Sequence, residues 1–282
     1  MKNKILPIIS IVILIAAVGV LLYPTISQWI NAMLCESAVT QYNNTTDALS
    51  AEDKAELLAQ ADEYNRGLSQ PVGDSFSSTA FTVDEEYLSI LDITENGQIG
   101  VIEIPSIDCS LPIYHSGGED MLTKGAVHLA GTSFPIGGIS THSVISAHTA
   151  YPGKIFFDKL TEVSIGDEFS VTVLGDTLYY MCIDISVVLP SDTSLLGIEE
   201  GKDLITLVTC TPYSINTHRL LVTGERIEKA SEVISTDDEA VTEYHTVHHA
   251  ATDIVPVLIV AGVVIIAVII LIWRKSRKAH EK

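Results

Sequence analysis

The chain has 282 residues, a formal net charge of −20 and a sequence pI of about 4.6. This length allows one good-sized domain with appendages, or two small domains. The acidic balance argues against a nucleic-acid partner, which would require clustered Lys and Arg. The hydrophobic content is nevertheless 47%, because apolar residues concentrate at the two ends of the chain.

The first apolar run extends from Ile5 to Tyr23 without a charge, and Lys2 and Lys4 precede it. About 20 apolar residues in a helix span the hydrocarbon core of a bilayer. A cleaved signal peptide begins in the same way, but no A-x-A-like cleavage site follows this run. We therefore expect residues 1–23 to form a cytoplasmic end and an uncleaved membrane anchor helix.

The second apolar run, residues 254–273, is uncharged and is followed by the basic stretch RKSRK within the tail at 274–282. This pattern predicts a second transmembrane helix with a basic stop-transfer flank. Positive residues lie at the outer end of both predicted helices, so the positive-inside rule places both termini in the cytoplasm. The acidic middle of the chain is then an extracytoplasmic domain that two helices tether to the membrane.

Residues 24–96 are predicted to form an extracytoplasmic segment that contains a helix and a loop. Ser50 is the expected N-cap of a helix that reads AEDKAELLAQADEYNRGL, with Glu52 and Asp53 in its first turn. An apolar stripe with helical spacing follows, made of Leu57, Leu58, Ala61, Tyr64 and Leu68. The next stretch, SQPVGDSFSSTAFT, has the composition of a loop.

Residues 97–228 contain about eight short β-branched runs separated by turn signals, which is typical of an antiparallel sandwich or a closed barrel. No ten-residue helical pattern separates the runs, so a parallel βαβ sheet is not expected. The segment 154–163, KIFFDKLTEV, is predicted to be one short helix. Residues 229–253 are acidic and read as a linker.

Four cysteines occur in the chain, and Cys210 is the one with polar and turn-forming neighbours. Cys109 and Cys182 sit in strand-like runs and are expected to be small buried residues. A thiol becomes a nucleophile only as a thiolate, so it requires a base or a nearby positive charge. His148 ends the β run SVISAH and is the best-placed candidate base. Arg219 begins the run RLLV, where a surface salt bridge and a cation beside an oxyanion both remain open.

The residues TLVTC at 206–210, followed by Arg219, resemble the T-L-x-T-C…R signature of sortases, the cysteine transpeptidases of Gram-positive cell surfaces. The blocks 99–115, 124–148 and 209–226 resemble those of the pilin-polymerising branch, class C. The resemblance implies a mainly β fold, a closed eight-stranded barrel with a few short helices. It also implies Cys210 as nucleophile, His148 as acid or base and Arg219 as the transition-state arginine, with no metal or organic cofactor.

Class C sortases also carry a lid upstream of the barrel, and the resemblance assigns this role to Asp74 and Phe76 in PVGDSFSS. Asp74 would pair with Arg219, and Phe76 would pack over the thiol. Ser75 stands where proline is common, which predicts a less rigid loop. An ordinary Ser-rich loop remains the alternative. A second departure is AHTAYPG at 147–153, where Gly-His-Arg-Gly is more frequent.

The implied reaction cleaves an LPxTG-like sorting signal between Thr and Gly, forms a thioacyl intermediate on Cys210 and transfers it to a lysine amine of a pilin subunit. The expected partners are pilin subunits and the lipid bilayer. A housekeeping-type sortase would attach surface proteins to a cell-wall precursor instead. A hydrolytic cysteine peptidase and a non-catalytic, membrane-tethered β binding module are the alternatives outside this activity.

Overall fold

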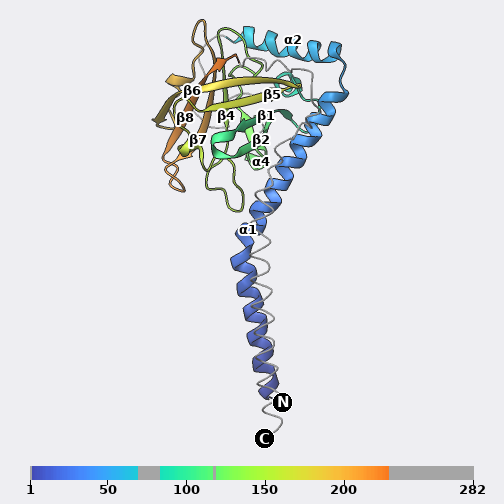
Figure 1. Ribbon diagram of the computed structural model, residues 1–282, viewed down its shortest axis with the longest axis vertical. Coiled ribbons are helices and arrows are strands. Elements are labelled where there is room, and N and C mark those ends of the chain that lie inside the picture. The colour runs from blue at the N-terminus through green and yellow to red at the C-terminus, as the bar shows by residue number, and fades with distance from the viewer. Residues whose placement is uncertain (1, 69–82, 117–118, 229–282) are drawn as a thin grey trace, which may run out of the picture. The chain divides into compact units, whose positions relative to one another are not determined.

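The computed structural model describes residues 2–68, 83–116 and 119–228 (Figure 1). They belong to two compact units. The first contains the chain up to Met33 together with Pro152–Lys154, and the second contains the described residues from Leu34 to Tyr151 and from Ile155 onward. The predicted linker at 229–253, the transmembrane helix at 254–273 and the basic tail lie outside the described residues.

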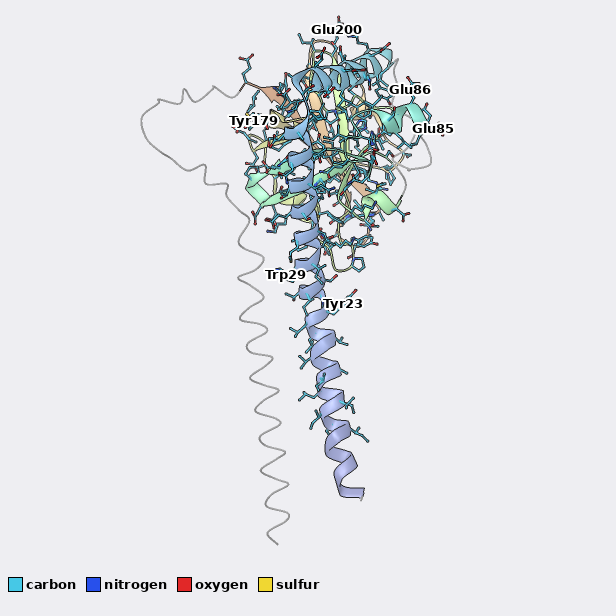
Figure 2. The ribbon with its side chains drawn as sticks, turned by 90° about the vertical axis from the view of Figure 1, so that its right-hand side faces the viewer. Tyr23, Trp29, Glu85, Glu86, Tyr179 and Glu200 are labelled. Atoms are coloured by element: carbon cyan, nitrogen blue, oxygen red, sulfur yellow. The ribbon has the colours of Figure 1, made fainter. Side chains whose placement is uncertain are left out.

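The first helix, α1 (Lys2–Ala48), contains the predicted N-terminal anchor. Its stretch from Ile9 is long and apolar enough to cross a membrane, with a mean hydropathy of 2.5, and it is the one such helix among the residues that the structure describes. Figure 2 shows Tyr23 and Trp29 on this helix. Aromatic residues of this kind are enriched at membrane–water interfaces.

The helix continues well beyond residue 23, because its later turns carry a buried stripe in the second unit. Cys35, Tyr42 and Thr46 are buried there at helical spacing. The Tyr42 hydroxyl donates to the Ile99 carbonyl at 2.8 Å and accepts from the Leu174 N–H at 3.0 Å. This part of α1 is therefore fixed to the strands by packing and hydrogen bonds together.

The predicted second helix is confirmed as α2 (Ala51–Gly67), which begins after a capping box formed by Ser50 and Asp53. Four of the five residues of the predicted stripe pack into the main core, the buried Ala61 and the partly buried Leu57, Leu58 and Tyr64. The short helix α3 (Glu85–Ser89) follows the undescribed segment, and Asp84 caps it by accepting the Tyr87 N–H. Its first residues, Glu85 and Glu86, are visible in Figure 2.

The eight strands form a closed barrel, as the resemblance to sortases implies and as one of the two alternatives from the strand pattern predicts. They are β1 (Gln98–Ile104), β2 (Cys109–Tyr114), β3 (Ala126–His128), β4 (Thr141–Ser146), β5 (Glu168–Val173), β6 (Asp176–Val188), β7 (Asp203–Thr211) and β8 (His218–Ile227). Short helical turns accompany them: η1 (Pro105–Ile107), α4 (Glu119–Leu122), η2 (Leu160–Glu162) and η3 (Ser194–Leu196). The order around the barrel is β1-β2-β3-β4-β7-β8-β6-β5.

The barrel is not purely antiparallel, contrary to the expectation from strand spacing. β2 pairs with β3 in parallel, and β4 pairs with β7 in parallel. The long connection between β4 and β7 contains β5 and β6, which gives the chain the length needed for a parallel crossover. This crossover places the end of β4 beside the end of β7.

Two apolar clusters occupy opposite sides of the β4-β7-β8 sheet. The main core includes Ile145 of β4, Leu207 of β7 and Val222 of β8. A second cluster, here called the outer cluster, consists of Leu129, Val144, Leu196, Val208 and Leu221, with Val188 packed against it. Neighbouring residues of a strand face opposite sides of the sheet. The two clusters therefore identify the side of the sheet to which each side chain points.

The prediction of a short helix at 154–163 was wrong, because this segment contains only a single 3₁₀ turn, η2. The adjacent side chains of Phe156 and Phe157 are both buried. The Asp158 carboxylate accepts the Phe156 N–H at 2.9 Å, and the His148 carbonyl accepts the Phe157 N–H at 3.0 Å. These donors are therefore used in contacts that a helix starting at Lys154 would not make.

Candidate active site

Cys210 and Arg219 lie directly opposite each other at the ends of two paired strands. β7 and β8 are antiparallel neighbours, and the Cα partners at this end are Cys210 with Arg219 and Thr211 with His218. The turn between them is closed by the Pro212 carbonyl, which accepts the N–H groups of Ile215 and Asn216. Two residues that are nine positions apart in sequence are therefore cross-strand neighbours.

His148 comes to the same edge of the sheet from the other side of β7. The parallel register of β4 and β7 pairs Ser146 with Val208. It continues past the end of β4, because the Ala147 N–H donates to the Val208 carbonyl at 3.1 Å. In this register His148, the next residue after Ala147, lies level with Cys210.

The three residues belong to the outer face of the sheet. Val208 and Leu221 are in the outer cluster, and Cys210 and Arg219 are each two residues away on the same strands. Val144 gives the same parity for β4, four residues before His148. The outer cluster therefore lies beside Cys210 and forms a buried apolar layer next to a polar group of three side chains.

The Arg219 guanidinium is held near the end of its own strand. Its Nη1 atom donates to the His218 carbonyl at 3.2 Å and to the Asn216 carbonyl at 3.4 Å. The side chain is half-buried, as is that of Cys210. A guanidinium keeps several N–H donors, so this anchoring leaves further donors for a substrate oxygen. His218 precedes Arg219 on the strand and therefore faces the other side.

The other three cysteines are poor candidates for a nucleophile. All four are free thiols, and Cys35 and Cys182 are buried. Burial raises the pKa of the Cys109 thiol to about 12 and also raises the pKa of Cys182. Both groups therefore remain protonated near neutral pH, and a thiol is a weak nucleophile in that form. The prediction that Cys182 is a buried residue is confirmed, whereas Cys109, at the start of β2, is only partly buried.

Three other histidines of the barrel are buried. His115, His128 and His142 are at most 1% exposed. His128 bonds to the Tyr87 hydroxyl and the Ser133 carbonyl, each at 2.9 Å. Since a carbonyl only accepts, Nε2 of His128 carries the proton and Nδ1 accepts from Tyr87. Burial lowers the pKa of His128 to about 3 and also lowers the pKa of the other two.

The predicted lid residues Asp74 and Phe76, with Ser75 between them, lie outside the described residues. Their pairing with Arg219 and their packing over the thiol stay predictions.

Residues that the sequence did not single out support this edge of the barrel. The Thr209 hydroxyl donates to the Ala147 carbonyl at 2.8 Å, so it ties β7 to the residue before His148. Tyr151 lies over the imidazole of His148, with ring centroids 5.1 Å apart and an interplanar angle of 29°. The AHTAYPG departure from the sortase pattern is the one sequence signal that points to Tyr151.

Comparisons with known proteins agree with this geometry. A sortase domain model matches residues 102–227. The chain is 31% identical to Sortase A of Streptococcus agalactiae over 170 residues, which cover 59% of this chain and 67% of the relative. It is 28% identical to Sortase D of Bacillus subtilis, where the match covers 47% of this chain and 66% of the relative.

Solved structures of sortase C enzymes match over nearly their whole length. Sortase C of Streptococcus pneumoniae is 37% identical with a TM-score of 0.63, and the match covers 68% of this chain and 97% of that chain. Sortase C-1 of Actinomyces oris is 45% identical with a TM-score of 0.58, covering 62% and 99%. A pilus-related sortase C of Group B Streptococcus is 38% identical with a TM-score of 0.62, covering 67% and 97%. The chain therefore belongs to the sortase family of transpeptidases, and its structural neighbours place it with the class C branch.

Proposed function

We propose that this sortase polymerises pilins, with Cys210 as nucleophile, His148 as general acid and base, and Arg219 as the oxyanion donor. The observation that carries the proposal is that the strand register brings these three residues next to one another at one edge of the β4-β7-β8 sheet. The pilus-related sortase C among the structural neighbours supports the choice of a pilin substrate.

The first half-reaction forms a thioester. The Cys210 thiolate attacks the carbonyl carbon between Thr and Gly of an LPxTG-like signal, and the carbonyl electrons move onto oxygen. Arg219 donates hydrogen bonds to this oxyanion, which stabilises the charge that develops in the transition state. His148 gives its proton to the Gly nitrogen as the C–N bond breaks, so a neutral amine leaves.

The second half-reaction releases the enzyme. A lysine amine of another pilin subunit attacks the thioester carbon while His148 accepts a proton from that amine. The C–S bond breaks, the Cys210 thiolate leaves, and an isopeptide bond remains. A thioester keeps the acyl group reactive, so transfer to an amine needs no further energy source.

The outer cluster lies beside the proposed site but is itself buried, since its five members are at most 6% exposed. Val208 lies two residues before Cys210 on β7, and Leu221 lies two residues after Arg219 on β8. Packing of this cluster therefore supports the strand ends that carry the proposed nucleophile and oxyanion donor.

The extracytoplasmic location is part of the proposal. The apolar helix α1 anchors the chain, the barrel lies outside the cell, and the segment 254–273 forms a second transmembrane helix that returns the tail to the cytoplasm. Pilin subunits that emerge across the membrane are then delivered close to the enzyme.

The test uses the full chain in detergent or nanodiscs with a purified pilin that bears a sorting signal. Covalent ladders of high mass, together with a Cys210 acyl adduct in mass spectrometry, are the expected result. Cys210→Ala should abolish both, and Arg219→Lys should slow acylation roughly 100-fold, the usual effect of losing one oxyanion donor. Transfer to a precursor-like amine without ladders would indicate a housekeeping sortase. Release of the free acid in the presence of amine would indicate a hydrolase.

A further inference from the structure

The far end of the segment after His148 is hydrogen-bonded back to the backbone of His148. The His148 carbonyl accepts the Phe157 N–H at 3.0 Å. The Asp158 carboxylate accepts two more backbone donors, the Ala150 N–H at 3.0 Å through Oδ1 and the Phe156 N–H at 2.9 Å through Oδ2. Phe156 and Phe157 are at most 2% exposed, so the returning end of the segment is anchored in the core.

The conformation at Ala150 shows why these hydrogen bonds are needed. Ala150 has a φ of 57°, in the left-handed region that costs a residue with a Cβ about 1–2 kcal/mol. A charge-assisted hydrogen bond from its N–H to a carboxylate offsets a cost of this size. The next residue is Tyr151, whose ring stacks on the imidazole of His148. The strained residue and its carboxylate partner thus determine where the tyrosine ring lies.

We propose that Asp158 is a positioning residue for His148, acting through the turn at Ala150 to hold the ring of Tyr151 against the imidazole. The Asp158 carboxylate itself bonds to backbone N–H groups of this segment. Its effect on the reaction comes through the ring that it places. An aromatic face restricts the rotation of the imidazole, and it also attracts the imidazolium form that donates the proton.

This inference rests on the proposed function, in which His148 transfers a proton in both half-reactions. A general acid that turns away from the leaving nitrogen is aligned for a smaller fraction of the time. The rate of the chemical step then falls, while binding of the peptide is unchanged. Loss of Asp158 should therefore lower kcat for acylation and for transfer and leave KM nearly unchanged.

The kinetic test compares Asp158→Ala and Asp158→Asn in the full chain. Asp158→Ala should lower kcat roughly 10-fold or more, within the range seen when a catalytic group is misplaced by about 1 Å, with KM changed less than about twofold. Asp158→Asn keeps one side-chain carbonyl acceptor and should recover most of the lost rate. Asp167→Ala is the matched control, because Asp167 also accepts a backbone N–H in a turn, from Ser164 at 3.0 Å.

A second readout does not depend on activity. The ring of Tyr151 shields the imidazole protons of His148, so their NMR signals in a chain labelled at histidine Cε1 should lie upfield. Asp158→Ala should move them toward the position of an unstacked histidine, Tyr151→Ala should do the same, and Asp167→Ala should not. Comparison with His148→Asn assigns the signals. If Asp158→Ala does not fold, Asp158→Asn and Tyr151→Ala still provide the comparison.

The two proposals fail in different ways. If His148→Asn still forms the acyl adduct at the wild-type rate, the proposed function is wrong whatever Asp158 does. If His148 is required but Asp158→Ala retains the wild-type kcat, or loses rate while the His148 signals stay in place, the positioning role of Asp158 is overturned.

Discussion

Asn65 on α2 holds the backbone of Phe134 with both ends of its amide, and its removal gives a sharp test of how the N-terminal helices are attached. The side-chain oxygen accepts the Phe134 N–H at 2.7 Å, and the side-chain nitrogen donates to the Phe134 carbonyl at 3.2 Å. Asn65 is 7% exposed and Phe134 is 1% exposed, so water cannot replace these bonds without a local rearrangement.

The expected cost of Asn65→Ala follows from the two groups left unpaired. A buried donor or acceptor without a partner costs roughly 1–3 kcal/mol, so two of them give about 2–6 kcal/mol. Alanine is the better helix former and returns about 0.5 kcal/mol. We therefore expect Asn65→Ala to lower the free energy of unfolding of the barrel unit by about 1.5–5.5 kcal/mol.

The assay is urea-induced unfolding of the full chain in detergent, followed by far-UV circular dichroism, with hydrogen exchange at the Phe134 amide as a local probe. Asn44→Ala is the control, because Asn44 is an exposed helical asparagine, and it should change the free energy by less than about 0.5 kcal/mol. If Asn65→Ala were no less stable than Asn44→Ala, or if the Phe134 amide kept its protection, the bidentate attachment would contribute nothing and the reasoning would be refuted.

The remaining predictions concern acid stability, thiol reactivity and the outer cluster. Folded His128 stays neutral until about pH 3, whereas unfolded histidines titrate near 6.5. The stability that it contributes is therefore fully present above pH 6.5 and is lost as the pH falls toward 3, by up to about 1.4 kcal/mol per pH unit; unfolding curves without this slope would contradict it. Iodoacetamide at pH 7.5 should label Cys210 and leave Cys109 unmodified, because burial raises the pKa of Cys109 to about 12; peptide mapping that finds Cys109 labelled first would refute this. Leu196→Ala should cost about 2–5 kcal/mol of stability, since Leu196 is 0% exposed. Urea unfolding that shows no loss of stability for Leu196→Ala would contradict this.

The sequence was a good guide wherever a local pattern has one physical meaning. Ser50 and Asp53 predict a helix start, and the structure contains that capping box. The number of short β runs predicts the strands, and the apolar N-terminal run predicts a helix long enough to span a membrane. Each of these depends on residues that are close in sequence, so propensity and periodicity are sufficient.

Local patterns failed where distant contacts compete for the same groups. The stretch KIFFDKLTEV has the composition of a helix, yet the Phe156 N–H donates to the Asp158 carboxylate and the Phe157 N–H donates to the His148 carbonyl, and only one 3₁₀ turn forms. The parallel pairing of β4 with β7 was also unexpected, because it requires a crossover that contains two further strands. Neither feature leaves a periodic signal in the sequence.

The sequence by itself determined the kinds of residue available for chemistry, a cysteine and an arginine in TLVTC…R and a histidine after a β run. It also determined the acidic composition and the apolar ends that indicate a membrane-tethered enzyme. Only the tertiary structure decided that His148, Cys210 and Arg219 share one edge, because strand register and the β4–β7 crossover link positions more than sixty residues apart. It also decided that Tyr151 lies on the histidine, since that contact depends on a strained alanine held by a carboxylate eight residues later.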